Sequence, residues 1–280
     1  MTSGTGAARQ IPAPPRRRER GLFRIGARIG RGGFVAIAGA VFLALLILWW
    51  FATALGLVGA LFLPAPGAVW MRLAKLSAEG TLWSDAGISL YRILVGFLIA
   101  SAMAIPIGVV IGCFRFWEAA IEPLADFIRY MPVVAFVPLT ILWSGTGDSQ
   151  KFLSIWIGTF FQQVLLIQDN VKRVPEDFIG LGRTLGFGDA KILIKIVVPS
   201  ALPGIWDTLR ISLGWAWTWL VVAELVAATS GLGYRITVSQ RYFQTDTIIG
   251  YILFLGVLGL ITDQLMKAAE RILFRYAAQG

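Results

Sequence analysis

Residues 174–203 read VPEDFIGLGRTLGFGDAKILIKIVVPSALP, and this stretch decides how the fold of the whole chain is interpreted. Its opening Pro-Glu-Asp, residues 175–177, predicts the start of a helix, because proline suits the first helical positions and acidic side chains suit the positive end of the helix dipole. Gly186 and Gly188 predict the end of that helix. An amphipathic stretch over 190–198 follows, so the pattern indicates a short helix, a turn and a second helix that leads into an apolar segment.

The composition around this stretch is that of a membrane protein. Of the 280 residues, 57% are hydrophobic and 15% are charged, and the mean hydropathy is +0.73. Soluble domains have roughly 45–50% apolar and about 25% charged residues, so a soluble globule could not bury this much apolar surface. This composition excludes disorder and collagen-like repeats. A disulfide scaffold is also excluded, because Cys113 is the single cysteine and can form no bridge within the chain. The chain has no histidine, which removes the commonest general base and the commonest metal ligand.

Six apolar segments are long enough to cross a bilayer. They cover residues 34–58, 86–113, 121–143, 152–168, 204–228 and 248–266. Gly108 and Gly112 in the second segment have the spacing that allows close approach of another helix. Pro106 predicts a kink there, and three prolines interrupt the third segment. We therefore expect a flexible basic arm over 1–33, a transmembrane domain over 34–268 and a cytoplasmic tail over 269–280.

The positive charges predict the orientation. Seventeen Lys and Arg residues fall on the side of the N-terminus, five on the opposite side and three within the apolar segments. Cytoplasmic loops of membrane proteins carry the excess of Lys and Arg, so both termini and the link over 172–200 are expected in the cytoplasm. A short helix in such a link projects from the membrane and suits the groove of a soluble partner.

In this link the sequence resembles the transmembrane permease subunits of bacterial ABC importers. Their cytoplasmic signature is Glu-Ala-Ala, three residues, Gly, nine residues, Ile, one residue and Leu-Pro. Gly186, Ile196 and Pro199 match it at that spacing, with Val198 in the place of Leu, while Gly-Leu-Gly at 180–182 replaces Glu-Ala-Ala. The runs RTLG (183–186), PSALPG (199–204) and LRISLG (209–214) are also similar to the family, and the resemblance covers about residues 60–268.

Within this superfamily the chain is most similar to the branch that imports nitrate, sulfonates, taurine or bicarbonate. The runs that carry this similarity are LPAP (63–66), SLYRILVGF (89–97), PIG (106–108), AEL (223–225) and GLGY (231–234). The resemblance implies an all-α polytopic membrane protein of the type I importer class, with about six transmembrane helices and a cytoplasmic coupling helix over about 175–186. It also implies the function: a permease subunit, not an enzyme, that passes a small solute, expected to be an anion, from a periplasmic binding protein into the cytoplasm.

The resemblance implies partners as well. These are a second permease chain, with a homodimer favoured over a heterodimer, two ATP-binding subunits and an extracytoplasmic substrate-binding protein at a bacterial inner membrane. No Gly-x-x-x-x-Gly-Lys-Ser/Thr motif occurs in the chain, so ATP and Mg are expected on the separate ATPase chain and no cofactor on this one. No catalytic, metal-ligating or nucleic-acid-binding residue is predicted, and the arginine-rich arm is interpreted as a topogenic signal beside the bilayer.

The residues implied to couple to the ATPase belong to the 172–200 link. They are Pro175, Glu176, Asp177, Gly180, Gly182, Arg183, Thr184, Leu185, Gly186, Ile196 and Pro199. The plainer interpretation is an ordinary helical hairpin in a cytoplasmic loop. Spacing, flanking residues and topology together favour coupling, although the glycines at 180 and 182 suit close packing as well as a hinge.

Polar groups inside the apolar segments are the candidates for the transport pathway or a gate. They are Asp126, Arg129, Gln162, Gln163, Arg210 and Glu224. Asp126 with Arg129, and Asp207 with Arg210, have the i,i+3 spacing of a structural ion pair, so a pairing role stays open for both. The two glutamines suit an anion that must pass without a deep binding well, and they also suit hydrogen bonds between helices.

Two other functional classes compete with this interpretation, and the cytoplasmic signature favours the permease over both. A self-contained channel or secondary transporter would need no ATPase, but it should show an inverted repeat or deep binding-site charges. An integral membrane enzyme lacks its parts, because the chain has no histidine and no cluster of acids in one cytoplasmic loop.

Overall fold

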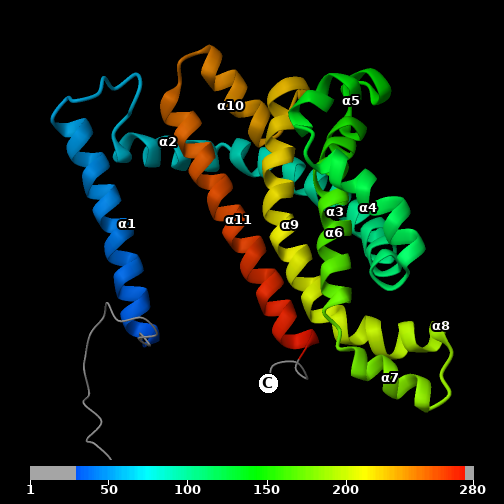
Figure 1. The fold of residues 1–280 in the computed structure, drawn as a ribbon. Coiled ribbons are helices and arrows are strands. Elements are labelled where there is room, and N and C mark those ends of the chain that lie inside the picture. Colours follow the sequence, from blue (N-terminus) through cyan, green and yellow to red (C-terminus); the bar gives the residue numbers. More distant parts are fainter. Residues whose placement is uncertain (1–29, 275–280) are drawn as a thin grey trace, which may run out of the picture. The chain divides into compact units, whose positions relative to one another are not determined.

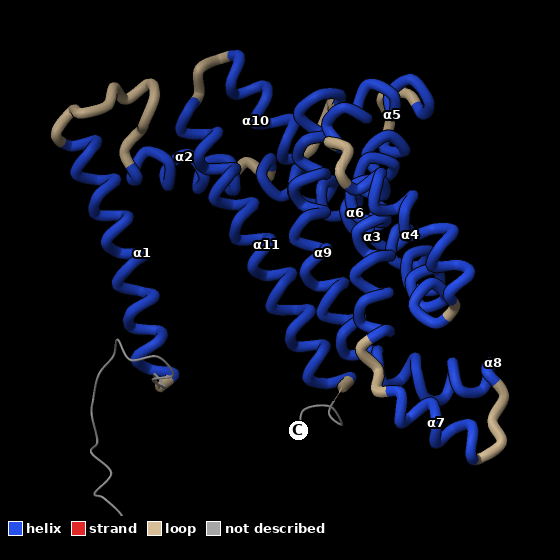
Figure 2. The backbone as a smooth tube through the Cα atoms, viewed as in Figure 1, coloured by secondary structure: helices blue, strands red, loops and turns tan. Residues whose placement is uncertain are grey.

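The computed structural model describes residues 30–274, and every regular element in that range is helical (Figures 1 and 2). The elements are α1 (Arg31–Ala54), α2 (Pro66–Ala78), α3 (Thr81–Cys113), α4 (Arg115–Arg129), the 3-10 helix η1 (Val133–Phe136), α5 (Val137–Ser144), α6 (Asp148–Lys172), α7 (Glu176–Thr184), α8 (Asp189–Ile192), the π-helix η2 (Leu193–Val197), α9 (Val198–Ala227), α10 (Leu232–Arg241) and α11 (Thr245–Leu273).

The two expected terminal segments lie mostly outside the described residues. Of the basic arm predicted over 1–33, residues 1–29 are outside the described range, and α1 already begins at Arg31. Of the tail predicted over 269–280, residues 269–273 are the last residues of α11, and residues 275–280 are outside the described range.

Helix α1 is a separate unit and is described by itself. It has 24 residues, and Arg31 at its first position is the one charged residue in its sequence. Large apolar side chains are exposed on all its sides, with Phe34, Leu43 and Trp50 among them. A helix that is apolar all round suits a lipid environment, so α1 has the length and composition of a membrane span.

Four helical stretches among residues 30–274 are long and apolar enough to cross a membrane: Gly32–Ala54, Thr81–Cys113, Asp189–Ala227 and Thr245–Leu273. A fifth is reached if α4 and the η1–α5 stretch, which meet at a bend of 90°, count as one broken span. The remaining predicted span, 152–168, corresponds to α6, which has 25 residues but carries Asp148, Gln150, Lys151 and further polar groups. Because many of these polar side chains are buried between helices, α6 does not need the uniformly apolar surface of a lipid-facing helix.

Proline explains why the third predicted span, 121–143, is broken. Pro132 precedes η1 and Pro138 lies in the first turn of α5, so the backbone cannot continue the α-helical hydrogen bonds of α4 through this region. Pro123 and Pro106, in contrast, lie inside α4 and α3, which continue past them. The structure therefore replaces one expected span by two helices that change direction.

Helices α3 and α6 meet along a row of small residues. Residues 96, 100, 104, 108 and 112 of α3 are Gly, Ala, Ala, Gly and Gly. A Cβ atom on Gly108 would lie 2.8 Å from the Ile167 Cβ, and one on Gly112 would lie 2.7 Å from the Val171 Cβ. The predicted close approach at Gly108 and Gly112 is confirmed, and the partner is α6.

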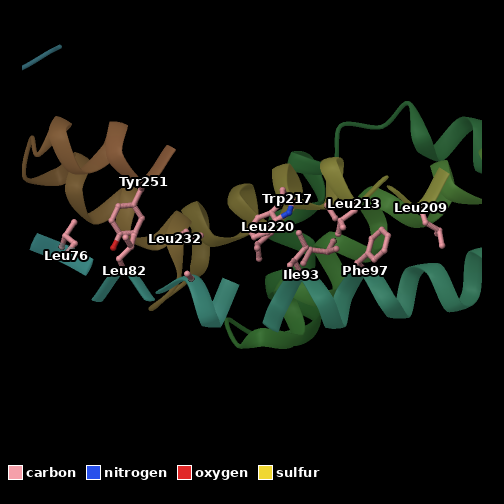
Figure 3. Packing of buried hydrophobic residues seen from close by; sticks show 13 residues of the cluster. Leu76, Leu82, Ile93, Phe97, Leu209, Leu213, Trp217, Leu220, Leu232 and Tyr251 are labelled. Carbon is pink, nitrogen blue, oxygen red and sulfur yellow. The ribbon is translucent and has the colours of Figure 1, made fainter. Parts of the chain in front are cut away.

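Two apolar clusters follow one another along the helices. The first joins α2, α3, α6, α9, α10 and α11, and Figure 3 shows its side chains in a row from Leu76 and Tyr251 to Leu209. The second surrounds Ile167, Ile192 and Ile205 and includes residues of α7 and α8. Figure 1 shows α7 and α8 at one end of α6 and α9, and α10 at the opposite end of α9. The molecule thus has two distinct ends where a partner can be received.

Candidate functional site

Helix α7 has the boundaries that the sequence predicts. It begins at Glu176, directly after Pro175, with Glu176 and Asp177 in its first turn and Arg183 in its last. At its end Gly186 has a left-handed φ of +74°. The Gly186 N–H donates to the Arg183 carbonyl at 3.0 Å, and the Phe187 N–H donates to the Gly182 carbonyl at 3.0 Å. These two bonds form a Schellman motif, which explains glycine at position 186 of the signature.

The second half of the signature holds α7 in place. Gly182 is buried, and a Cβ atom there would lie 2.7 Å from the Ile196 Cδ1 and 3.1 Å from the Ile192 Cγ1. Ile196 belongs to η2, so this contact joins the last turn of α7 to the base of α9. Gly180 has nothing within 4 Å of its Cβ position. Close packing therefore accounts for the glycine at 182 but not for the one at 180.

The outer face of α7 is apolar. Phe178, Leu181 and Leu185 are 49%, 60% and 62% exposed, while Ile179 on the same helix packs against the second apolar cluster. Positions 178, 181 and 185 fall on one side of a helix. The three residues therefore form an exposed apolar row on α7, at the end of α6 and α9.

The stretch after α7 differs in detail from the prediction. The amphipathic segment expected over 190–198 forms the single turn of α8 and the π-helix η2, and α9 continues from it without a break in direction. A π-helix is rare and accommodates a local disturbance of the helical ladder. Here the disturbance comes from Pro199, which has no N–H to donate to the preceding turn. Helix α8, η2 and α9 are therefore one helical rod, Asp189–Ala227.

Four of the six pathway candidates form ion pairs, and three of these, Asp126, Arg129 and Arg210, lie in pairs that the spacing predicts. The Arg129 Nε lies 2.8 Å from the Asp126 Oδ1, and both side chains are partly exposed. Arg210 bonds Asp207 on its own helix and the Asp263 Oδ1 of α11 at 3.0 Å. The expected i,i+3 pairs are confirmed. The bond to Asp263 in addition joins α9 to α11, which the sequence spacing did not predict.

The two glutamines of α6 differ in their surroundings. Gln163 is fully buried, and its Nε2 donates to the Ser101 Oγ of α3 at 3.2 Å. Its Oε1 has no partner among the described residues. Gln162 is half-buried. Gln163 is thus a link between helices, and Gln162 is the one of the pair that keeps some accessible surface.

Glu224 lies in a buried ionic cluster rather than on an open surface. It is 1% exposed, and its carboxylate accepts the Arg92 Nη1 at 2.8 Å, the Ser89 Oγ at 2.9 Å and the Gly233 N–H at 2.9 Å. Gly233 is the second residue of α10, so the carboxylate also caps that helix. In this geometry Glu224 is a buried carboxylate that is paired with Arg92.

Further charged residues complete this cluster. Arg92 donates to the Asp148 Oδ1 at 2.7 Å and to the Ser230 carbonyl at 2.7 Å. Lys151, 1% exposed, donates to the Thr146 carbonyl at 2.6 Å and to the Ala227 carbonyl at 2.7 Å. We call the group Ser89, Arg92, Asp148, Lys151, Glu224 and Ser230 the α10-end cluster.

A second pair lies beside the α10-end cluster. Asp85 accepts the Arg235 Nε at 2.9 Å and the Tyr251 hydroxyl at 3.0 Å. The hydrogen bond to Asp85 raises the pKa of Arg235, so that residue stays charged. The site residues predicted from the sequence do not include Asp85, Arg92, Lys151 or Arg235. Their partners are far apart in sequence, 132 positions for Arg92 and Glu224 and 150 for Asp85 and Arg235, so spacing alone carries no signal.

No group of three or more potential metal ligands occurs among residues 30–274. The comparisons with known proteins identify the family instead. Residues 104–275 match the model of the family described as "Binding-protein-dependent transport system inner membrane component". The chain belongs to this family.

Individual relatives agree with that assignment. A probable ABC transporter permease protein of Brucella melitensis is 39% identical over 228 residues, which is 81% of this chain and 92% of that protein. The taurine transport system permease protein of Escherichia coli is 32% identical over 232 residues, which is 81% of this chain and 84% of that protein. The bicarbonate transport system permease protein of Synechococcus elongatus is 28% identical over 198 residues, which is 70% of this chain and 71% of that protein.

A solved structure shows the same fold. The inward-facing MetNI methionine ABC transporter aligns with a TM-score of 0.59 at 18% identity, over 66% of this chain and 92% of the matched chain. The protein is therefore a multi-pass membrane permease subunit of an ABC importer, and it is a transport component rather than an enzyme. Permeases of this family act together with an ATPase and a binding protein.

Proposed function

We propose that this permease passes a small anion from an extracytoplasmic binding protein into the cytoplasm. Its relatives include permeases named for taurine and bicarbonate transport, whose cargoes carry a sulfonate or carbonate group. The neutral Gln162, half-buried on α6, suits weak hydrogen bonds to such a cargo, since transport needs release as well as binding. Asp126 and Arg129 neutralise one another at 2.8 Å and add no net charge to a pathway.

In this proposal α7 is the coupling helix. Its exposed row Phe178, Leu181 and Leu185 inserts into a groove of the ATP-binding subunit, and the Gly186 turn and the Ile196 contact hold the helix rigid. A rigid helix seated in a partner converts rotation of that partner into tilt of the attached spans. The exposed apolar row on α7 is the single observation that carries the proposal.

The assembly follows from the same proposal. Two permease chains line one pathway, as a homodimer, and two ATP-binding subunits hold ATP and Mg, since this chain has no phosphate-binding loop. Both termini lie on the cytoplasmic side of the inner membrane with α7, and α10 faces the binding protein. The distribution of Lys and Arg, seventeen against five, supports this orientation.

Co-purification tests the coupling role. We expect Leu181→Ser to reduce recovery of the ATP-binding subunit with the tagged permease about five- to thirtyfold, because a central apolar anchor of an interface contributes roughly 1–2 kcal/mol. Leu142→Ser is the matched control, because Leu142 is 79% exposed on α5. Equal recovery with both variants, together with uptake that needs no ATPase, would favour a self-contained transporter.

The cargo is tested on the extracytoplasmic binding protein of the complex. We expect calorimetry to show binding of one of taurine, an alkyl sulfonate, nitrate or bicarbonate, and uptake of that same anion by cells that express the whole complex. Tight binding of a cation, with none of the four anions bound, would refute the anion assignment and leave the coupling role of α7 untouched.

A further inference from the structure

The helical rod that starts at α8 reaches both ends of the permease. Asp189–Ala227 is one stretch of 39 residues, which corresponds to about 58 Å at roughly 1.5 Å per residue. Its first turns contact α7 through Ile192 and Ile196, which lie against Gly182. Its last turns hold Glu224 in the α10-end cluster. The same element therefore carries the coupling contact and this cluster.

Glu224 joins the end of the rod to the start of α10 by direct hydrogen bonds and close packing. Its carboxylate accepts the Gly233 N–H, and Ser89 connects it to the Leu232 N–H at 2.9 Å. A Cβ atom on Gly231 would lie 2.4 Å from the Glu224 Oε1, and one on Gly233 would lie 2.7 Å from the Glu224 Cβ. The two glycines thus allow the backbone of α10 to close directly onto the carboxylate.

Arg92 joins the same carboxylate to α3, to α6 and to the turn before α10. Its guanidinium donates to Glu224 of α9, to Asp148 at the start of α6, and to both the carbonyl and the hydroxyl of Ser230. Lys151 adds bonds from α6 to the carbonyl of Ala227, the last residue of α9. Each of these charged groups has a partner, so a movement of α9 that kept its bonds would carry α10 with it.

We propose that Glu224 and Arg92 are positioning residues that transmit a displacement of α9 to α10, and so connect the ATPase-facing end of the permease to the face that receives the binding protein. The inference rests on the proposed coupling role of α7. It goes beyond that role, because it assigns the opposite end of the path to named residues. It also explains why an ionic cluster is kept where an apolar contact would pack as well: charged hydrogen bonds fix direction and register.

A label on α10 tests the proposal in the whole complex. The permease carries Cys113→Ala and Arg241→Cys, the latter at the exposed end of α10, with a bimane fluorophore on the new thiol. The complex with its ATP-binding subunits is placed in liposomes and trapped with ATP, Mg and vanadate. We expect trapping to shift the bimane emission, and Glu224→Gln to reduce the shift at least about fivefold at equal trapped nucleotide, the lower range of allosteric coupling.

Two further variants keep the outcome decisive. Glu79→Gln is the control, because Glu79 is exposed and its side chain pairs with Lys75 at 3.9 Å rather than with a residue of the α10-end cluster, and it should retain the full shift. Ser89→Ala removes one hydroxyl without changing charge, so it should reduce the shift even if Glu224→Gln does not assemble.

A full shift with Ser89→Ala and with an assembled Glu224→Gln would overturn the proposal. The proposal would also be overturned if trapping did not shift the bimane emission in the permease with an unaltered α10-end cluster. The coupling role of α7 is judged separately by recovery of the ATP-binding subunit with Leu181→Ser, so the two failures are distinguishable.

Discussion

At the scale of single residues, Gly182 shows how a departure from a family signature is compensated by its neighbours. The signature has alanine at this position, and the missing methyl group leaves the space that the Ile196 Cδ1 occupies at 2.7 Å from the Cβ position. We expect Gly182→Ala to lower the stability of the α7 contact by about 1 kcal/mol, the lower end of the cost of overpacking, because the Ile196 Cδ1 is the end of a flexible side chain that can move aside. The measurement is recovery of the ATP-binding subunit with the permease and the thermal midpoint of the purified complex.

The same site supplies its own rescue and control. Ile196→Val removes the Cδ1 atom, so the double variant Gly182→Ala with Ile196→Val should recover most of the loss. Gly180→Ala, with nothing within 4 Å, should be neutral or stabilise α7 by up to about 1 kcal/mol of helix propensity. If Gly180→Ala harms the complex and Gly182→Ala does not, the packing explanation is wrong and a partner contact at 180 replaces it.

At the scale of elements, the row of small residues on α3 is the feature on which the packing of the permease depends most. A Cβ atom on Gly108 would meet not only the Ile167 side chain but also the Val164 carbonyl at 2.8 Å, and backbone cannot move aside cheaply. We expect Gly108→Ala to cost about 1–3 kcal/mol and to lower the melting temperature of the detergent-purified permease. Gly256→Ala on α11, with open space at its Cβ position, should leave the melting temperature unchanged within a degree or so.

The elements also show what sequence could and could not predict. Pro175 with its acids, Gly186, and the spacing of Gly108 and Gly112 each act locally, so α7 and the close approach on α3 followed from the residues themselves. The sequence predicts one span over 121–143, whereas the structure has a 90° bend between α4 and the η1–α5 stretch. Hydropathy does not show this bend, because it averages over the prolines that cause it.

The α10-end cluster could not be predicted for a different reason. Its partners come from α3, α6 and α9, and a charge at the end of an apolar segment looks the same whether it snorkels to water or pairs inside. Only the fold brings Arg92, Asp148 and Glu224 together. The partners of a buried charge in a membrane protein therefore cannot be predicted from the spacing of charges along one sequence.

At the scale of the whole molecule, the two ends of α9 must lie on opposite sides of the bilayer if the Lys and Arg distribution sets the orientation. We expect Arg183→Cys, on α7, to resist a membrane-impermeant maleimide in intact spheroplasts, and Arg241→Cys, on α10, to react with it, both in a Cys113→Ala background. Both thiols should react after permeabilisation, which controls for burial. Labelling of Arg183→Cys alone in intact spheroplasts would place α7 outside the cell, where no ATPase can reach it, and would overturn both the orientation and the coupling role together.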